Sequence, residues 1–180
     1  VWFQTISDWG FNYTATRDIA RNRDNLDRVS EIFSNVLWAR LFLMLASFAL
    51  LSFLIAVVPY FKENKVILLV SFLLIPGHIF FPDWFFQAME RMKYITIFNL
   101  IAKAVFTTLI FIFVTTKADY ILPLLFTSLG FVASGIVAMY IILAKWGVRL
   151  HAPKWQPICL TLRNSTDVFI NNVIPNFYNS

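Results

Sequence analysis

Long uncharged runs alternate with short charged stretches along this chain. Four of the runs are long enough to cross a ~30 Å hydrocarbon core as helices that rise ~1.5 Å per residue. They are Leu41–Phe61, Val66–Met89 (interrupted by Asp83), Tyr94–Thr116 (interrupted by Lys103) and Tyr120–Ala144. Shorter apolar runs, Val1–Ser7 and Val168–Ser180, are interpreted as the end of one span and the start of another, cut by truncation of a longer chain. The pattern predicts an all-α, polytopic membrane protein with four complete and two partial transmembrane helices.

The segment between the first two apolar runs has a pattern of its own. Apolar residues recur at helical spacing from Leu26 to Val36, with charged residues elsewhere around the helix. Two interpretations stay open. The segment is either an amphipathic helix lying at the membrane interface, or the first turns of the following span.

Lysine and arginine residues are distributed unequally between the two sides of the predicted spans. If the chain crosses at every span, one side receives Arg17, Arg21, Arg23, Arg28, Arg40, Arg91, Lys93, Lys145, Arg149, Lys154 and Arg163. The other side receives only Lys62, Lys65 and Lys117. Because cytoplasmic loops carry an excess of basic residues, the first group is predicted to face the cytoplasm. An aromatic belt is expected from the residues near span ends, which are Trp38, Tyr60, Trp84, Tyr94, Tyr120 and Trp146.

Composition excludes several classes of protein. Hydrophobic residues make up 59% of the 180 residues and charged residues 14%, against about 25% charged in a soluble domain. A soluble protein of this size could not bury that much apolar surface, so lipid must solvate part of it. The net charge of +5 comes from residues between apolar runs, and no nucleic-acid partner is predicted. Phosphate-loop and metal-ligand spacings are absent from the sequence, so neither a catalytic residue nor a metal site is predicted.

Lys103 is the most informative polar residue because it interrupts a predicted span. A lysine near the centre of a transmembrane helix costs ~2.5–3.5 kcal/mol on insertion scales, so it normally faces a bundle interior or a wet cavity. Thr96, Asn99 and Thr107 are spaced so that they share its helix face. The alternative is that Lys103 snorkels to the headgroups while Asn99 bonds to a neighbouring helix.

A second informative stretch should break its helix. Pro76, Gly77 and Pro82 lie inside one predicted span, and proline removes a backbone donor and clashes with the preceding turn. Loosened backbone at membrane depth is typical of transporters, where it lines a cavity. The alternative is an ordinary kink near the interface, with Asp83 and Glu90 hydrated or paired with Arg91 and Lys93.

Small residues recur at intervals of four in the last complete span. They are Gly130, Ser134 and Ala138. Such a ridge predicts close packing against another helix rather than a ligand site.

Two segments carry a family resemblance. Residues 82–92, Pro-Asp-Trp-Phe-Phe-Gln-Ala-Met-Glu-Arg-Met, are followed by Asn99 and Lys103, and residues 10–20 read Gly-Phe-Asn-Tyr-Thr-Ala-Thr-Arg-Asp-Ile-Ala. In this order they resemble the polysaccharide-repeat-unit (O-antigen) flippases of the multidrug/oligosaccharidyl-lipid/polysaccharide exporter superfamily. The resemblance covers nearly all of this chain and less than half of a typical member. Ala88 departs from the family pattern, where a glycine is expected.

The resemblance implies a transporter of about twelve helices in two six-helix lobes around a lumen. On that template, residues 1–7 end transmembrane helix 2 and residues 8–36 form a cytoplasmic loop with an amphipathic helix. Residues 37–145 contain helices 3 to 6 of the N-terminal lobe. Residues 146–166 form the cytoplasmic inter-lobe loop, and residues 167–180 start helix 7.

The implied function is transport rather than enzymatic catalysis. Such a protein translocates a polyprenyl-pyrophosphate-linked oligosaccharide from the cytoplasmic to the periplasmic face of the bacterial inner membrane, by alternating access of its two lobes. The lumen candidates that the resemblance implies are Lys103 and Arg40 as charges, Asn99 and Gln87 as hydrogen-bond donors, and Asp83, Thr96 and Thr107. No cofactor is implied, and a coupling ion, H⁺ or Na⁺, is left open. The expected partners are the lipid-linked oligosaccharide, membrane lipids and other polysaccharide-assembly proteins.

Two other functions stay open. A multidrug or toxin extruder of the same superfamily would favour an acidic cavity, whereas the mid-span charge here is basic. A membrane-embedded polysaccharide polymerase or acyltransferase should show a large periplasmic loop or a catalytic His/Asp pair, and the predicted outer connections are short.

Overall fold

The computed structural model describes residues 2–114 and 121–178, with side chains described within residues 3–114 and 121–171. Every regular element in these ranges is helical. In chain order the elements are α1 (Trp2–Asp8), α2 (Phe11–Arg21), α3 (Leu26–Val57), α4 (Pro59–Glu63), α5 (Lys65–Phe72), α6 (Leu74–Phe80), α7 (Asp83–Ala88), α8 (Met92–Phe113), α9 (Leu122–Tyr140), the π-helix η2 (Ile141–Lys145) and α10 (Trp155–Tyr178).

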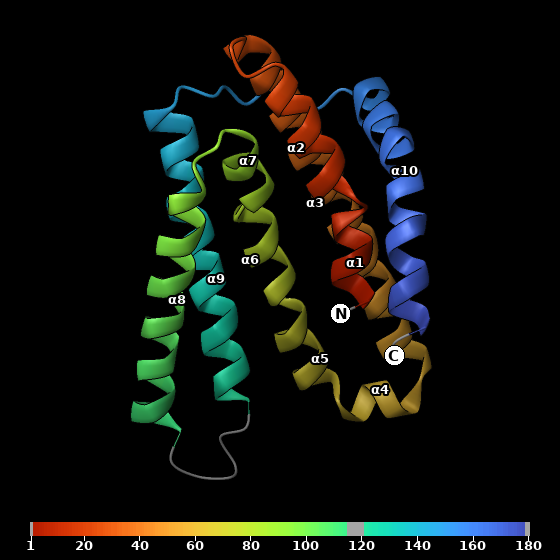
Figure 1. Cartoon of the computed structure of the whole chain (residues 1–180). Coiled ribbons are helices and arrows are strands. Elements are labelled where there is room, and N and C mark those ends of the chain that lie inside the picture. The colour runs from red at the N-terminus through yellow and green to blue at the C-terminus, as the bar shows by residue number, and fades with distance from the viewer. Residues whose placement is uncertain (1, 115–120, 179–180) are drawn as a thin grey trace.

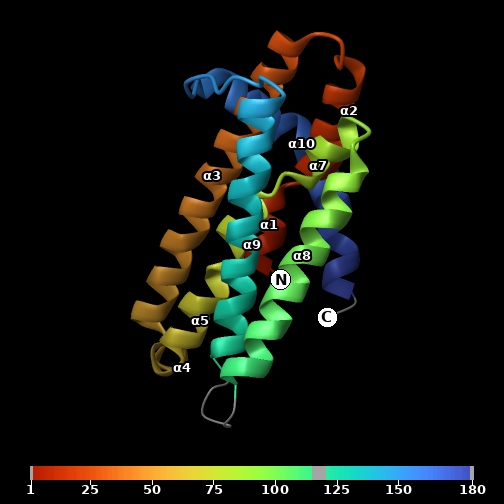
Figure 2. The same ribbon diagram turned by 90° about the vertical axis from the view of Figure 1, so that its left-hand side faces the viewer.

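The long helices run back and forth between the two ends of an elongated bundle. Helix α3 descends, α5 to α7 return, α8 descends, α9 rises, and α10 descends again (Figures 1 and 2). Within the described ranges, four stretches are long and apolar enough to cross a membrane, namely Leu26–Val57, Lys65–Ala88, Met92–Phe113 and Leu122–Lys145. The predicted class, an all-α polytopic membrane protein, is therefore confirmed.

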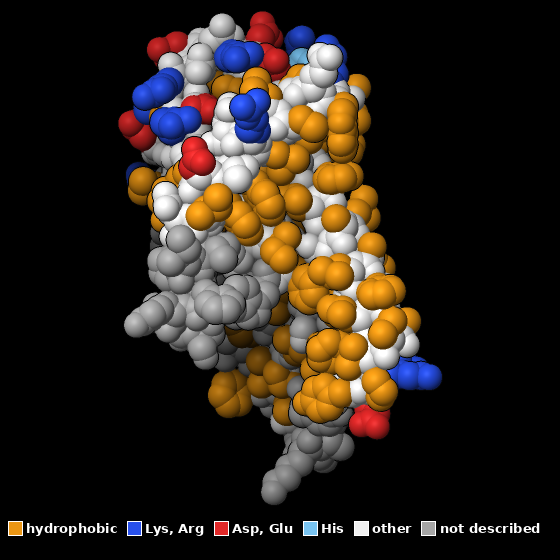
Figure 3. All heavy atoms as spheres, turned by 90° about the vertical axis from the view of Figure 1, so that its right-hand side faces the viewer, with side chains coloured by type: hydrophobic (Ala, Val, Ile, Leu, Met, Phe, Trp, Pro, Cys, Tyr) orange, Lys and Arg blue, Asp and Glu red, His pale blue; other side chains and the backbone are white. Residues whose placement is uncertain are grey.

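One end of the bundle holds most of the charge. It consists of α2, α7, the start of α8 and the segment 146–154, and we call it the charged end (Figure 1). Figure 3 shows acidic and basic side chains gathered there above a broad apolar surface. The opposite end carries α4, which contains Lys62, and the start of α5 at Lys65. Lys117 and Tyr120 lie outside the described residues.

The start of α3 decides between the two interpretations of residues 26–36. The side chain of Asn25 caps the helix by accepting a hydrogen bond from the backbone N–H of Arg28 at 3.1 Å. From Leu26 the helix continues without a break to Val57, about 48 Å at 1.5 Å per residue. These residues are therefore the first turns of a long helix. A separate amphipathic helix does exist in this loop, but it is α2, which buries Phe11 and Ile19.

The span that contains the prolines is broken twice. Helices α5, α6 and α7 are separated at Leu73 and at Phe81–Pro82. Pro76 lies in the first turn of α6, where it cannot donate to the carbonyl of Phe72, and the break lies just before that turn. At the second break Pro82 directly precedes α7. The predicted interruption is present, and the chain bends where proline removes the backbone donor.

Glycines allow α6 and α9 to approach very closely. A Cβ atom on Gly77 would lie 2.7 Å from Cβ of Phe131, and one on Gly135 would lie 2.8 Å from Cβ of Phe80. At Gly130 the nearest atom is Cδ1 of Phe106, at an ordinary 3.7 Å. Among these glycines, the closest approach between helices is therefore at Gly77 and Gly135, not at Gly130 of the predicted ridge. Ala138, another residue of that ridge, is fully buried.

An aromatic cluster fills the core near the charged end. Trp84, Phe85 and Phe86 of α7 are fully buried. Phe33 of α3 stacks on Trp84 at 5.7 Å, and Trp146 packs against Phe86 at 5.6 Å. Trp84 thus belongs to the core of the bundle, and the half-buried Trp146 packs against that core, so neither lies in a lipid-facing aromatic belt.

The segment between η2 and α10 is fastened to α3. Ser34 accepts a hydrogen bond from the backbone N–H of His151 at 2.9 Å, and Ser30 accepts one from Arg149 at 3.1 Å. The indole N–H of Trp38 donates to the carbonyl of His151 at 2.9 Å. Because α10 already begins at Trp155, this connection is shorter than the predicted loop 146–166.

Candidate functional site

Arg40 is buried inside the bundle, with only 1% of its surface exposed. Its Nη2 lies 3.1 Å from Oδ1 of Asp8 and donates to Oδ1 of Asn12 at 2.6 Å. The guanidinium also lies 5.8 Å from the ring centroid of Trp84. A buried charge must be paired and hydrogen-bonded to be tolerated, and here α1, α2 and α7 supply the partners for a residue of α3. Arg40 was grouped with the loop arginines from sequence. That grouping is wrong, because the residue lies well inside α3.

Further ionisable groups surround this pair. Asp8 interacts electrostatically with His78 and Asp83 as well as with Arg40. His78 itself stacks on Phe131 of α9 at 4.6 Å. The cluster joins α1, α3, α6 and α7, so it connects two of the three helices of the broken span to the rest of the bundle.

Two buried donors of the cluster have no hydrogen-bond partner among the described residues. They are Nε of Arg40 and Nε1 of Trp84. An unsatisfied buried donor typically costs about 1–3 kcal/mol, which a protein seldom keeps without a reason. Sequence reasoning did not assign Asp8, Asn12 or His78 to a site. Their position beside apolar runs was the only sequence feature that set them apart. The spacing of residues along the chain does not show which distant segments contact each other.

The predicted stripe on α8 lies on the surface of the described structure. Thr96, Lys103 and Thr107 are exposed, and Asn99 is half-buried. Lys103 is 11 residues from the start of α8, or about 16 Å along the axis. It makes no ion pair or hydrogen bond within the described ranges. The helix face that packs inward is the neighbouring one, where Ala102 is buried.

Gln87 and Asp83 do not lie near Lys103. They lie near the Arg40 cluster, at the charged end. Gln87 is exposed and lines a shallow pocket of about 430 Å³ with Asn12, Tyr13, Thr16 and Arg17. Asp83 starts α7, where its Oδ1 accepts from the backbone N–H of Trp84 at 2.8 Å. The structure thus gathers Arg40, Asp83 and Gln87 around α2. No hydrogen bond or ion pair in the described part of the chain links them to Lys103.

Glu90 has a structural partner that sequence reasoning did not name. Its Oε1 accepts from Nη2 of Arg23 at 2.8 Å, rather than pairing with Arg91 or Lys93. This exposed hydrogen bond lowers the pKa of Glu90 and raises that of Arg23. The pair links the α2–α3 turn to the α7–α8 turn, which indicates a role in holding the charged end together.

Comparison with known proteins identifies the family. The family model described as "Polysaccharide biosynthesis protein" matches residues 1–180. The chain belongs to this family. It is 27% identical over 173 residues to the "Putative O-antigen transporter" of Escherichia coli (strain K12), covering 96% of this chain and 42% of that protein. It is 27% identical over 175 residues to the "Putative O-antigen transporter" of Shigella dysenteriae, covering 96% and 43%. No solved structure matches the chain.

Family membership fits the architecture described above. The chain spans about two-fifths of the length of the curated relatives it matches. With four helices among the described residues that are able to cross a membrane, it is part of a multi-pass membrane protein of this family. The resemblance found in residues 10–20 and 82–92 is confirmed, and both segments belong to the region where α2 and α7 meet (Figure 1).

Proposed function

We propose that the complete protein is a flippase for a lipid-linked oligosaccharide in the bacterial inner membrane. It would move a polyprenyl-pyrophosphate-linked O-antigen or polysaccharide repeat unit from the cytoplasmic to the periplasmic face. The names of the relatives support export of such a polymer. The observation that carries the proposal within this chain is Lys103, a cation in the middle of an apolar helix that no described residue neutralises.

The position of Lys103 fits a lumen better than a lipid-facing surface. A lysine facing lipid at mid-span would cost a few kcal/mol, and the hydroxyl and amide groups on its helix face would lose their water as well. A polar lumen between two lobes removes both costs. In return, a cation in that lumen offsets the hydration that a pyrophosphate loses when it leaves water. Lys103 and Asn99 are therefore assigned to the head-group path, with Thr96 and Thr107 along it.

Arg40 receives a different role in this proposal. Its guanidinium is already bound to Asp8 and Asn12, so it positions α1 and α2 rather than offering a free charge. Asp83 and Gln87 stay candidates at the cytoplasmic mouth. Alternating access of two lobes and coupling to H⁺ or Na⁺ belong to the same proposal.

Substitution of Lys103 tests the proposal. Lys103→Leu should reduce surface polysaccharide at least tenfold while the protein stays in the membrane, because the head group loses its countercharge. Lys103→Arg keeps the charge and should retain most export. Val105→Leu, an exposed apolar position two residues away, is the matched control. Normal export by Lys103→Leu would remove Lys103 from the lumen, and loss of protein from the membrane in that variant alone would indicate a packing role.

A further inference from the structure

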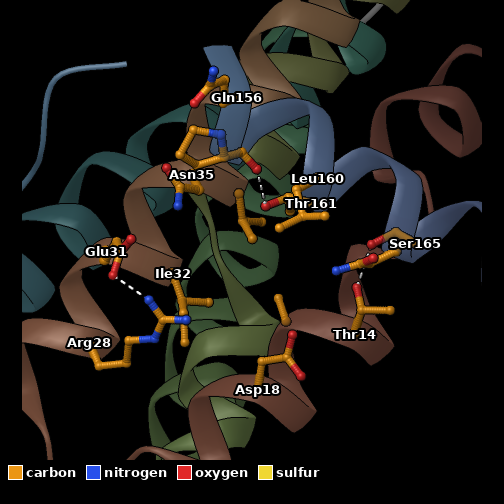
Figure 4. A pocket seen from close by; sticks show the side chains of 14 residues that line it. Thr14, Asp18, Arg28, Glu31, Ile32, Asn35, Gln156, Leu160, Thr161 and Ser165 are labelled. Carbon is orange, nitrogen blue, oxygen red and sulfur yellow. Dashed lines mark hydrogen bonds and ion pairs between the residues drawn. The ribbon is translucent and has the colours of Figure 1, made fainter. Parts of the chain in front are cut away.

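A polar cleft lies between α2, α3 and the first turns of α10, and neither Lys103 nor a residue of the Arg40 cluster lines it. Its volume is about 390 Å³, within the ~300–1,000 Å³ usual for small-molecule sites. Figure 4 shows Thr14 and Asp18 of α2, Asn35 of α3, and Gln156, Thr161 and Ser165 of α10 around it. The cleft thus joins the first part of the chain to the helix that follows the connection 146–154.

The cleft offers free hydrogen-bonding groups. The side-chain amides of Asn35, Gln156 and Asn164 line it and make no hydrogen bond to any described residue. Each amide presents both a donor pair and an acceptor. By contrast, Thr14 and Ser165 satisfy each other at 2.7 Å, and Thr161 donates to the carbonyl of Pro157 at 2.8 Å. The amides are the groups available to a ligand.

The charges in the cleft are already paired. Arg28 forms an ion pair with Glu31 from the same helix, and Asp18 pairs with Arg17 at 3.0 Å. Among the described residues that line this first cleft, no unpaired cation is therefore offered to a phosphate. Apolar side chains complete the lining, among them Ile32, Val36 and Leu160. A surface of amides with apolar patches suits an uncharged ligand that carries hydroxyl groups and C–H faces, which is the chemistry of a sugar ring.

The cleft continues into a second hollow toward the connecting segment. That hollow measures about 500 Å³ and shares Arg28, Glu31, Asn35 and Pro157 with the first. Its own charges, Asp27 and Lys154, are of opposite sign. Neither of these two charges forms an ion pair with a described residue, so the paired charges are those of the first cleft, where the three amides lie.

We propose that this groove binds uncharged sugar residues at the charged end of the molecule. The identity of the natural ligand, the glycan of a lipid-linked oligosaccharide, rests on the proposed function. Two parts of the substrate then bind at different places. The amides between α3 and α10 bind the glycan, and Lys103 on α8 binds the pyrophosphate. A sugar bound here bridges α10 to α2 and α3.

Binding of a lipid-free glycan to the complete purified protein tests this. The probe is the host strain's repeat-unit oligosaccharide, released from its lipid pyrophosphate by mild acid, with affinity measured by calorimetry and contact by saturation-transfer NMR. The double variant Asn35→Ala/Asn164→Ala should bind it at least tenfold more weakly, the equivalent of losing one to two net hydrogen bonds. Asn171→Ala, an exposed asparagine of α10 outside the groove, should bind normally.

A second probe separates sugar recognition from head-group recognition. Farnesyl pyrophosphate should bind the wild type and the double variant within twofold of each other. Equal glycan affinity in wild type and double variant, no glycan binding by the wild type, or an equal loss of farnesyl pyrophosphate binding would each overturn the proposal. Since Gln156 is exposed, Gln156→Ala gives a second test without risk to folding. Normal export by Lys103→Leu would count against the proposed function alone, because glycan binding is measured without transport.

Discussion

A buried arginine such as Arg40 is tolerated only through its partners. Three elements converge on it from around α3, because Asp8, Asn12 and Trp84 come from α1, α2 and α7. Desolvating two charges costs several kcal/mol per ion, and the direct pair with its added hydrogen bond offsets that cost. Lys103 is the opposite case, a charge without a partner in the described ranges. The contrast indicates that Arg40 organises the bundle and that Lys103 is available to a ligand.

Removal of one member of the Arg40–Asp8 pair should therefore destabilise the protein. Arg40→Met leaves the Asp8 carboxylate unpaired, and breaking a buried pair costs about 3–5 kcal/mol. The lower end is expected, because 32% of the Asp8 side chain is exposed to solvent. The melting temperature of the purified protein should fall. The double variant Asp8→Asn/Arg40→Met should melt higher than Arg40→Met alone, and a lower value would show that the two residues are not coupled.

At the level of elements, the packing of the broken span against α9 depends on the close approach of the two helix backbones. Prolines open the span at two points, and Gly77 then lets α6 approach α9 more closely than any side chain would allow. Gly135 does the same from the other helix, against Phe80. Close approach of this kind gains van der Waals contact, which drives helix association where lipid removes the hydrophobic effect.

Alanine substitutions at the three glycines of α6 and α9 should distinguish glycines that a close helix contact requires from a glycine in ordinary packing. Gly77→Ala and Gly135→Ala place a Cβ within 2.7 Å and 2.8 Å of a neighbour, and overpacking of this kind costs about 1–3 kcal/mol. Backbone atoms of α9 lie only 3.1 Å from the Gly77 Cβ position, so a side chain cannot simply move aside. Gly130→Ala, with 3.7 Å to its neighbour, should be neutral or stabilising. Comparable melting temperatures for all three variants would contradict the assignment.

For the whole molecule, the helices alternate in direction and carry their charges to one end. This arrangement follows from the cost of placing Lys, Arg, Asp and Glu in hydrocarbon. The connection 146–154 lies on α3 at that end, where the hydrogen bonds of Ser30 and Ser34 fix it. The start of α10 is thereby held close to α3.

Topology can be tested with reporter fusions in the intact protein. Fusions at Lys62 and Lys117 should report the periplasm, and a fusion at Lys154 should report the cytoplasm, because the basic residues of the charged end resist translocation. Alkaline phosphatase and green fluorescent protein report opposite sides and serve as mutual controls. The reverse pattern would invert the direction of transport proposed above.

Much of the fold was predictable because lipid imposes a simple rule on the chain. A span must be helical, apolar and about 20 residues long, so the four long helices follow from uncharged runs, and proline positions predict the breaks. The candidate site was less predictable. Lys103 stands out in sequence as a charge in an apolar run. Arg40 stands out less, because only the length of α3 shows that it lies inside a helix and not in a loop.

By itself, the sequence determined the four long apolar helices, the charged end and the presence of a polar stripe on α8, because each depends on local composition and helical period. Only the tertiary structure decided what those residues meet. It placed Asp8, Asn12 and Trp84 around Arg40, brought Gly77 and Gly135 to the α6–α9 contact, and formed the amide-lined groove between α3 and α10. Those pairings join segments far apart in sequence, and their energies depend on distances that no local pattern encodes.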